Sequence, residues 1–582
     1  MMWASDFETT TKIEDCRVWA YASCEIGNED NIIIGNSLDE FMKICEYSDN
    51  DTHYFHNEKF DGEFIISWLF KHNYRWVKDK KDFESKTFTT LISDKGLFYS
   101  LEVCFSKYNR GRKNTVKFLD SMKLYNMSVE DISKGFKLPL SKLEIDYEED
   151  RPIGHILTEK EVDYITNDVK IVAIALNYLI KLGHKKMTIG SNALEEYKNL
   201  IGKKLFDYNF PPPYYDAEIR QAYKGGFTYL NPEFRNILID RGFVLDVNSL
   251  YPSVMAGVEN EKLPYGEGVY YEGKYKNDNL YDLFIQSFSC NFEIKENKIP
   301  CLQIKNNLSF KETEYLTSSN GETVSLCLCN VDLKLFFEQY NVYNITYYGG
   351  YKFKSSINLF KSYIDKWTEI KIHSKKDGNH ALYLISKLFM NSLYGKFASN
   401  PLAGTKIPID VDGVVSYKNG GIEEKDVVYL PIGVFVTAWA RDKTIRSAQK
   451  IEDEHRNGNS DIRFIYADTD SLHIFSPSGL LPTYLKIDDY TLGAWKVESE
   501  FEKARFIRQK TYIEYSKEYG KNESYKINIV CAGMPKKVYQ YVTFDNFVEG
   551  STYDYGKLRP KHCKGGIVLV PQPFTIIKSK VS

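Results

Sequence analysis

Long apolar runs are missing from this sequence. No window approaches the run of about 18 consecutive apolar residues that identifies a membrane-spanning helix. The first ten residues, MMWASDFETT, lack the basic segment followed by an apolar one that marks a secretory signal. We therefore expect a folded protein that is neither secreted nor embedded in a membrane.

Cysteine is scarce and scattered. The 10 cysteines run from Cys16 to Cys563, only Cys327 and Cys329 lie close together, and no CxxC pair occurs. This spacing indicates neither a zinc site nor a dense disulfide framework. Reduced thiols in a cytoplasm are the expectation.

An overall excess of positive charge is absent too. The chain holds 76 Lys and Arg against 79 Asp and Glu, a net charge of −3, which removes the simplest argument for nucleic-acid binding. The balance is uneven, however, because residues 501–582 hold 15 Lys and Arg against 7 Asp and Glu, a local net of +8, which leaves −11 for the first 500 residues. This segment could hold a polyanion, although a basic solvated face explains the charge alone equally well.

Length and aromatic content are what the chain has in abundance. Its 582 residues are 43% hydrophobic and 15% aromatic, with 44 Tyr, which predicts a folded chain of three or four domains at roughly one per 150 residues. The first 185 or so residues alternate short β-like runs with helical patterns. Residues 183–197 read as a connector, 241–255 as an apolar strand entering a turn at a proline, and 464–475 as a hairpin.

Three aspartates from Asp246 onward form the more specific of two acidic sets. Asp246 ends an apolar strand in VLDVNSLYP, and Asp468 and Asp470 lie in YADTDS between β-forming residues. Side chains two apart on a strand share a face, and buried like charges repel unless cations neutralise them. Mg²⁺ takes such ligands together with substrate phosphates. YADTDS alone also fits an exposed turn, but its pairing with DVNSLYP favours phosphoryl transfer.

A lysine-bearing helix is predicted between these motifs. Lys387, Asn391 and Tyr394 in KLFMNSLYGKF are spaced i, i+4 and i+7 and share one face. A lysine offers a point charge to phosphates, while an amide and a ring can hold a sugar and a base. Lys371 could add a phosphate contact. Taken alone, this face fits an ordinary amphipathic surface; between two aspartate motifs it favours a triphosphate site.

The N-terminal acidic set has the same chemistry. Asp6 and Glu8 in SDFETT would share one side of a strand, Asp61 lies in HNEKFDG, and Asp168 follows Tyr164 by one helical turn. Four acidic ligands and a tyrosine that orients a water fit two-metal hydrolysis of a phosphodiester. Each residue alone would more often be structural or solvated.

In their order along the chain these segments resemble a known family. SDFETT, HNEKFDG and YITND resemble the three exonuclease motifs of the DEDD type, whereas DVNSLYP, KLFMNSLYGKFASN, YADTDS and RQKTY resemble motifs A, B, C and Lys-x-Tyr of family B DNA polymerases. The similarity covers nearly the whole chain and is closest to the protein-primed, phi29-like phage enzymes. YKGGF at 223–227 resembles their Tyr-x-Gly-Gly signature.

The resemblance implies an α/β and α+β multidomain fold, with an RNase H-like 3′-5′ exonuclease domain followed by a right-hand polymerase domain carrying two insertion subdomains. The implied parts are the exonuclease 1–185, palm 186–255 and 431–531, insertion 1 256–352, fingers 353–398, insertion 2 399–430 and thumb 532–582. Insertion 1 would help bind a priming terminal protein. Insertion 2 would support strand displacement and processivity.

The resemblance also implies a role for each motif residue. In the polymerase site these are Mg²⁺ ligands (Asp246, Val247, Asp470), a supporting carboxylate (Asp468), nucleotide contacts (Tyr251, Lys371, Lys387, Asn391, Tyr394) and primer or template contacts (Tyr223, Gly225, Gly226, Lys510, Tyr512). In the exonuclease they are metal ligands (Asp6, Glu8, Asp61, Asp168), the water-orienting Tyr164 and DNA contacts (Thr9, Asn57, Phe60, Ser121, Lys142). Two Mg²⁺ ions per site are implied, with Mn²⁺ as a substitute.

The predicted function is therefore a DNA-directed DNA polymerase that replicates a linear viral genome by protein-primed initiation, with strand displacement and proofreading. Its partners would be template and primer DNA, dNTPs, a terminal protein and a viral single-stranded-DNA-binding protein, and it would act as a monomer in the cytoplasm of the infected bacterium. A conventionally primed family B polymerase and a non-catalytic DNA-binding replication protein are the alternatives. An RNA polymerase is disfavoured because tyrosines stand at both sugar positions.

Four departures from the family pattern qualify the transfer. The first exonuclease strand begins almost at Met1, so its pairing is expected to be shorter. Ala467 replaces a frequent cysteine and Met122 replaces a leucine, neither of which binds metal. Tyr383 stands where a further lysine is expected, which would either weaken triphosphate binding or move it to Lys375 or Lys376.

Overall fold

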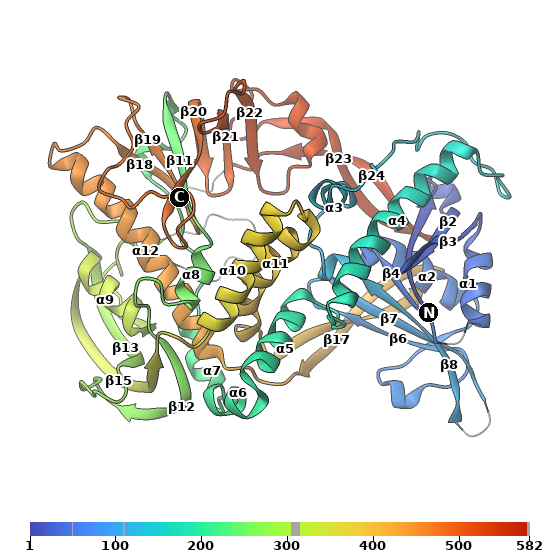
Figure 1. Cartoon of the computed structure of the whole chain (residues 1–582), viewed down its shortest axis with the longest axis horizontal. Helices are drawn as coiled ribbons and strands as arrows, with labels where there is room; N and C mark the ends of the chain where they lie inside the picture. Colours follow the sequence, from blue (N-terminus) through green and yellow to red (C-terminus); the bar gives the residue numbers. More distant parts are fainter. Residues whose placement is uncertain (49, 109–110, 304–314, 579–582) are drawn as a thin grey trace.

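An eight-stranded mixed sheet forms the N-terminal part of the computed structural model, which describes residues 1–48, 50–108, 111–303 and 315–578 (Figure 1). The strand order is β3-β2-β1-β4-β8-β7-β6-β5. The strands are β1 Met2–Thr9, β2 Val18–Glu25, β3 Asn28–Gly35, β4 Thr52–Phe55, β5 Arg75–Trp76, β6 Thr87–Ile92, β7 Phe98–Lys107 and β8 Lys113–Asp120. Strand β2 is buried at seven of its eight positions because helices cover both faces of the sheet.

Helices cover both faces of this N-terminal sheet. Helix α4 (Glu159–Lys181) begins at a capping box between Thr158 and Glu161 and packs on β1 and β2. Helices α1 (Leu38–Tyr47) and α2 (Glu58–Lys71) pack on the other face, where Phe7, Phe41 and Phe64 share a core. A short helix, α3 (Val129–Phe136), lies beside α4.

The first strand is fully paired despite the early start of the chain. Strand β1 pairs antiparallel with β2 from Trp3 and parallel with β4 from Met2. The expectation of shorter pairing is therefore wrong, because Met2 and Trp3 already pair with the neighbouring strands.

A second sheet carries the C-terminal motifs. Its order is β22-β21-β20-β11-β19-β18-β9, with β10 beside β20. Its strands are β9 Thr228–Leu230, β10 Leu238–Ile239, β11 Gly242–Val247, β18 Arg463–Asp468, β19 Ser471–Phe475, β20 Trp495–Arg508, β21 Thr511–Glu518 and β22 Lys526–Cys531. Segments more than 200 residues apart, β11 and β19, are therefore neighbours.

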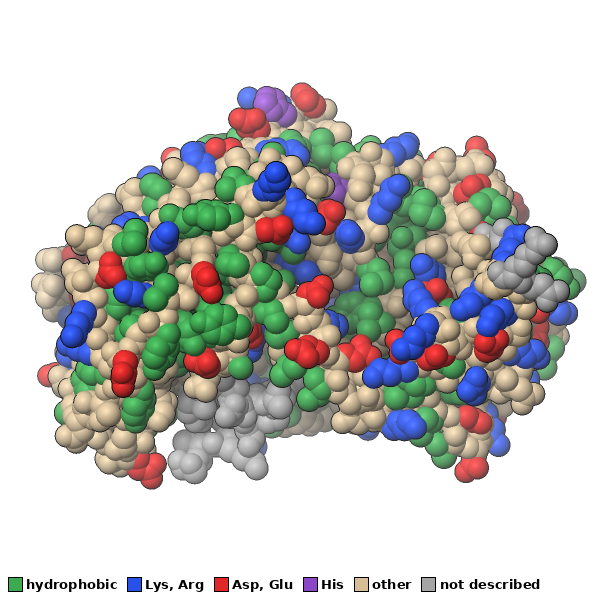
Figure 2. Space-filling model, turned by 90° about the horizontal axis from the view of Figure 1, so that it is seen from below, with side chains coloured by type: hydrophobic (Ala, Val, Ile, Leu, Met, Phe, Trp, Pro, Cys, Tyr) green, Lys and Arg blue, Asp and Glu red, His purple; other side chains and the backbone are tan. Residues whose placement is uncertain are grey.

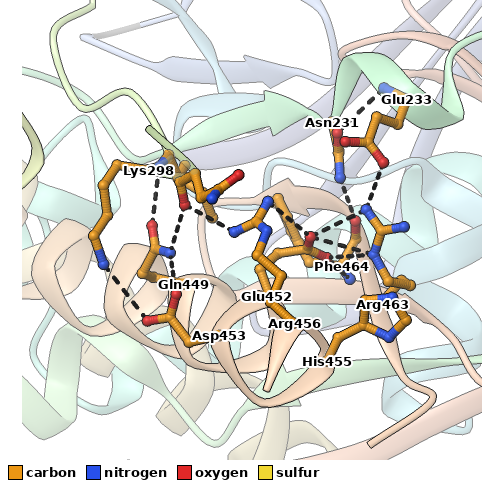
Figure 3. A network of polar contacts seen from close by, with 12 residues as sticks. Asn231, Glu233, Lys298, Gln449, Glu452, Asp453, His455, Arg456, Arg463 and Phe464 are labelled. Carbon is orange, nitrogen blue, oxygen red and sulfur yellow. Dashed lines mark hydrogen bonds and ion pairs between the residues drawn. The ribbon is translucent and has the colours of Figure 1, made fainter. Parts of the chain in front are cut away.

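Helix α12 (Leu430–Arg456) supports this sheet through a buried carboxylate (Figure 3). Glu452 accepts hydrogen bonds from the Arg463 guanidinium at 3.1–3.2 Å and from the Phe464 backbone N at 2.8 Å. Because Arg463 and Phe464 begin β18, these bonds fix the strand that ends at Asp468. On the same helix, Gln449 bonds the backbone of residues 297–299.

The stretch 256–352 forms a sheet of its own, apart from residues 304–314, which lie outside the described residues. Its order is β12-β15-β13-β14, with strands β12 Leu263–Glu272, β13 Leu283–Ile294, β14 Val324–Cys329 and β15 Tyr340–Ser356 and with helix α9 Asn330–Gln339. Broken β patterns in the sequence thus correspond to one four-stranded sheet, because β13 and β15 are long, bulged strands that pair with each other.

Helices link the two large sheets (Figure 1). Helices α10 (Lys361–Lys376) and α11 (His380–Phe397) pack side by side, and α5 (Ile189–Ile201) packs on α11. Two short helices follow α5, namely α6 (Lys203–Asn209) and α7 (Asp216–Ile219). The interpretation of 183–197 as a connector is only partly right, because the segment enters a helix at Ile189.

The proline of DVNSLYP lies inside a helix rather than ending in a turn. Helix α8 (Leu250–Met255) holds Pro252 at its third position, where a backbone N–H has no partner within the helix and the proline costs no hydrogen bond.

No helix in the described ranges has the length and apolarity needed to cross a bilayer. All ten cysteines are free thiols.

Two hairpins reach the N-terminal sheet from the polymerase-like half. One is β16 (Leu402–Val411) with β17 (Val414–Glu424), and the other is β23 (Thr552–Cys563) with β24 (Gly566–Thr575). Cys563, Ile567 and Val568 at the second hairpin are buried in one core with Phe64 of α2. The two hairpins also meet each other at the bridge between Val414 and Lys564.

The tip of hairpin β23–β24 allows a test of how the hairpin packs on the N-terminal part of the chain. Gly565 has φ +97°, and a Cβ there would lie 2.2 Å from the Cys16 carbonyl oxygen, so Gly565→Ala adds a steric clash to the ordinary left-handed strain of about 1–2 kcal/mol. We expect faster backbone hydrogen exchange throughout β24. Gly520→Ala is the matched control, since Gly520 has φ +73° and open space around it. Equal exchange in both variants would contradict the docking.

Candidate active sites

The N-terminal carboxylates converge from three elements. Asp6 and Glu8 alternate along β1, Asp61 lies in the first turn of α2, and Asp168 lies in the middle of α4. Glu8, Asp61 and Asp168 are only 6%, 4% and 3% exposed. The sequence prediction that these four residues form one cluster is matched by their mutual electrostatic effects, because Asp6 and Glu8 act on Asp61, and Asp168 acts on Asp6.

Burial makes this cluster unfavourable as a set of free anions. It raises the pKa of Asp6 from 3.8 to about 7, with the Asp168 charge adding to the effect. Burial and the charges of Asp6 and Glu8 likewise raise the pKa of Asp61 well above its usual range. The buried Oδ1 atoms of Asp61 and Asp168 have no hydrogen-bond partner. The cluster therefore has more acceptor oxygens than donors to pair with them, and its negative charges repel one another.

A hard divalent cation fits that excess. Carboxylate oxygens are the ligands of Mg²⁺, which also keeps waters or substrate phosphates in its shell. In the described part of the chain no group of three or more Asp, Glu, His or Cys side chains is arranged to hold a metal ion by itself. Lys142 supplies part of the missing positive charge, since its Nζ donates to Asp168 Oδ2 at 2.8 Å.

Tyr164 lies beside the carboxylates with its hydroxyl fixed. It is 2% exposed, and its Oη is 2.6 Å from that of Tyr147. The Lys142 Nζ lies 5.9 Å from the Tyr164 ring centre. Tyr147 was missed by the sequence prediction because it lies in an irregular segment, where no periodicity connects it with α4.

The predicted single-strand contacts differ in exposure. Thr9 and Phe60 are partly exposed near the carboxylates, and Asn57 adopts a left-handed conformation at φ 85° directly before α2. Ser121, in contrast, is fully buried, and its Oγ bonds the Phe55 carbonyl at 3.0 Å and His56 Nδ1 at 2.9 Å. In this structure the Ser121 hydroxyl supports the turn before α2 and is not presented at the surface.

The C-terminal aspartates meet at one end of the second sheet. Asp246 pairs with Ser471 of β19, Asp468 ends β18, and the Val247 backbone N donates to the Asp470 carbonyl oxygen at 2.8 Å. Asp470 lies in the turn between β18 and β19. The expectation that alternation along a hairpin aligns Asp468 with Asp470 is therefore wrong, because the left-handed Thr469 at φ 64° directs this turn.

Lysines neutralise these aspartates in part. Burial raises the pKa of Asp246 from 3.8 to about 6, against the opposing charge of Lys496. The Lys496 Nζ is 3.4 Å from Asp246 Oδ1, and the Lys510 Nζ is 2.9 Å from both Asp468 oxygens. Burial also raises the pKa of Asp470. As in the first cluster, carboxylate oxygens whose negative charges repel one another suit a divalent cation.

The α11 face lies across from these aspartates. Tyr394 stacks on Tyr251 of α8, with ring centres 4.1 Å apart and planes at 25°, and Lys387 and Asn391 on the same helix are exposed. Lys371 of α10 is partly buried, and its pKa is lowered by burial and then by the Lys387 charge. The predicted lysines, amide and rings thus belong to one region.

The remaining motifs adjoin the aspartates. Lys510 donates its backbone N to Tyr466 Oη at 2.9 Å, and Tyr512 stacks on Phe506 at 5.1 Å. Lys496, Glu498 and Tyr512 line an open groove of about 740 Å³. Glu498 and Lys496 were not predicted, because only the β11–β20 register brings them to Asp246.

The Tyr-x-Gly-Gly segment, with Tyr223 at its start, is fixed by hydrogen bonds to its backbone and by close packing. Gly226 faces the motif turn so closely that a Cβ would lie 2.6 Å from Thr469 Oγ1, whereas Gly225 faces open space. The guanidinium of Arg441, a residue that the sequence prediction missed, donates to the Lys224 and Gly225 carbonyls at 2.8 and 2.7 Å. This segment therefore contacts the aspartate turn.

Positive charge is not confined to the C-terminal segment. On the face drawn in Figure 2, Lys and Arg side chains gather over the half of the molecule that holds the N-terminal sheet. Local positive charge of this kind attracts polyanions even when the whole chain is nearly neutral.

Known proteins resemble this chain over its whole length. Residues 44–478 match the family model described as DNA polymerase type B, organellar and viral. The DNA polymerase of Bacillus phage Nf is 45% identical and that of Bacillus phage phi29 is 44% identical, each match covering 99% of both chains. A solved phi29 DNA polymerase complexed with primer-template DNA and incoming nucleotide substrates superposes with a TM-score of 0.90 at 43% identity, covering 99% of both chains.

The first cluster predicts a pH-dependent stability in the absence of metal. With its pKa raised from 3.8 to about 7, folded Asp6 binds more protons than unfolded Asp6 within that window, so its contribution to folding falls as pH rises. In EDTA, the melting temperature of the wild type should fall more steeply than that of Asp6→Asn between about pH 4 and about pH 7. Mg²⁺ should remove the difference.

Asp163→Asn is the control for that measurement, because Asp163 is exposed on α4. It should keep the wild-type slope in scanning calorimetry. Equal slopes for Asp6→Asn and the wild type would contradict a buried ionised cluster.

Proposed function

This chain belongs to the type B DNA polymerases and, within them, to the phi29-like phage group, and we propose that its two carboxylate clusters divide synthesis and proofreading between two sites. Its activity is that of a DNA-directed DNA polymerase. The observation that carries the proposal is the pair of separated acidic clusters, each buried enough to raise carboxylate pKa values and each in contact with a lysine. The parts implied by the family, namely exonuclease, palm, fingers, thumb and two insertions, are assigned to the ranges given above.

Divalent cations are the cofactor that both clusters would hold. Asp246, Asp470 and the Val247 backbone would bind them in the polymerase site, and Asp6, Glu8, Asp61 and Asp168 in the exonuclease site. Bound there, Mg²⁺ or Mn²⁺ would lower the pKa of the attacking hydroxyl or water and stabilise charge on the leaving oxygen.

The side chains of α10 and α11 would position the incoming nucleotide. Lys371 and Lys387 attract the triphosphate, and their charges favour the leaving pyrophosphate over the bound substrate. The stacked rings of Tyr251 and Tyr394 leave no room for a ribose 2′-hydroxyl on that side of the sugar, which selects dNTPs. Lys510 and Tyr512 hold the primer end, so its 3′-hydroxyl meets the α-phosphate in line.

Proofreading would use the N-terminal cluster. A frayed primer end entering past Thr9, Asn57 and Phe60 would meet Tyr164, whose hydroxyl is held by Tyr147 and can orient a water. Lys142 would stabilise the scissile phosphate. Tyr223, Gly225 and Gly226 would guide the template between the sites, since Gly226 faces the motif turn and Arg441 holds the carbonyls of Lys224 and Gly225.

Initiation would use a protein hydroxyl as primer. A serine, threonine or tyrosine of a terminal protein meets the same requirement as a DNA 3′-hydroxyl, because the site needs only a positioned hydroxyl. Insertion 1 would bind that protein, and insertion 2 with hairpin β23–β24 would promote strand displacement. The chain would work as a monomer in the cytoplasm of the infected bacterium, together with a viral single-stranded-DNA-binding protein.

Separate removal of the two clusters tests the division of labour. Asp470→Ala should reduce primer extension at least about a hundredfold, since metal stabilisation is worth several kcal/mol, and should leave single-strand degradation unchanged. Asp6→Ala with Glu8→Ala should do the reverse. Both activities are measured on one labelled primer with and without dNTPs. If either variant lost both activities while keeping its melting temperature, two independent sites would be excluded.

Protein priming has its own assay. The enzyme, its phage terminal protein and a labelled dNTP are incubated with Mg²⁺ and without a nucleic-acid primer. We expect label on the terminal protein with the wild type and none with Asp470→Ala. Label that persists in Asp470→Ala, or extension of DNA primers alone, would reject this mode of initiation.

A further inference from the structure

Lys496 occupies the space between the aspartates and the fingers helices. It lies directly opposite Asp246 in the antiparallel pairing of β11 with β20, and its Nζ is 3.4 Å from Asp246 Oδ1. Its side chain is 35% exposed and lines the open groove beside Tyr512. The ammonium is therefore tethered to the palm sheet but free to reach the groove.

The same ammonium acts on the fingers. The charges that act on Lys371 are those of Lys387, Lys496 and Lys375, all positive, and they add to burial in lowering its pKa. No carboxylate contributes. Cations gathered in this way repel one another unless an anion enters between them. A polyphosphate is the anion whose charge and length suit lysines on two facing elements.

The fingers leave room for such a contribution. Tyr383 lies one turn before Lys387 on α11, and its ring centre is 5.8 Å from the Lys387 Nζ. That position therefore presents a ring beside Lys387 in place of a further positive charge.

We propose that Lys496 binds the phosphate tail of the incoming nucleotide from the palm side, opposite Lys371 and Lys387. The inference rests on the proposed function of this site. Lysine suits the role because its flexible four-carbon stem carries a point charge with three donors. One ammonium can thus pair with Asp246 before the nucleotide arrives and with phosphate oxygens afterwards.

A second role for Lys496, as a counter-ion of Asp246 alone, makes a different prediction. A counter-ion that positions Asp246 changes the rate of the chemical step and leaves nucleotide affinity unchanged. A phosphate ligand changes the affinity for dNTP and for pyrophosphate together, since both carry the same oxygens.

The test measures nucleotide binding without turnover. Enzyme on a primer ending in a dideoxynucleotide is titrated with the matched dNTP or with pyrophosphate. Lys496→Gln should weaken both about tenfold or more, the usual effect of losing one charged hydrogen bond, and Lys496→Arg should stay close to the wild type. Lys517→Gln is the matched control, because Lys517 lines the same groove and pairs with Glu500 at 3.0 Å. Tyr383→Lys should restore part of the affinity lost in Lys496→Gln.

Three further measurements keep the outcomes distinct. Single-strand degradation and the melting temperature report whether Lys496→Gln is folded. In the wild type, bound dNTP should protect Lys496 from acetylation, as read by mass spectrometry. Unchanged affinities in Lys496→Gln, or no protection in the wild type, would overturn the inference. Failure of the wild type to extend a primer would instead overturn the proposed function.

Discussion

Repulsion among buried carboxylates is the constraint on which this structure depends. Two acidic clusters are held where burial raises the pKa values of Asp6 and Asp246 to about 7 and about 6, a cost that nearby cations reduce. Lysines supply part of that charge in every case, as Lys142 on Asp168, Lys496 on Asp246 and Lys510 on Asp468. Divalent cations and polyanionic substrates would supply the rest.

The scaffold serves these clusters by placing acids on rigid elements. Each cluster takes its ligands from a strand end and from a helix or turn beside it, and buried polar contacts fix the neighbours. Glu452 of α12 holds the start of β18 (Figure 3), and the Arg441 guanidinium holds the glycine segment that faces Thr469. Sites supported in this way lose little freedom when substrate binds.

Positive charge gathers locally although the chain as a whole is nearly neutral. The C-terminal segment is positive in sequence, and its hairpin β23–β24 packs on α2 beside the N-terminal sheet. On the face drawn in Figure 2, Lys and Arg side chains gather over that same half of the molecule. A net charge of −3 over the whole chain therefore does not exclude binding of a polyanion, because local surfaces can carry positive charge.

The sequence by itself determined the elements and the motifs. Short β-like runs alternating with helical patterns predicted a mixed N-terminal unit, helical spacing placed Lys387, Asn391 and Tyr394 on one face, and the order of seven motifs identified the family, because these signals are local and periodic. Tertiary structure alone decided which charges meet. In the folded structure Tyr147, Lys496 and Arg441 lie in the sites, Ser121 is buried and Asp470 lies in a turn. Strand register and helix packing produce these positions, because they join residues that no local pattern connects.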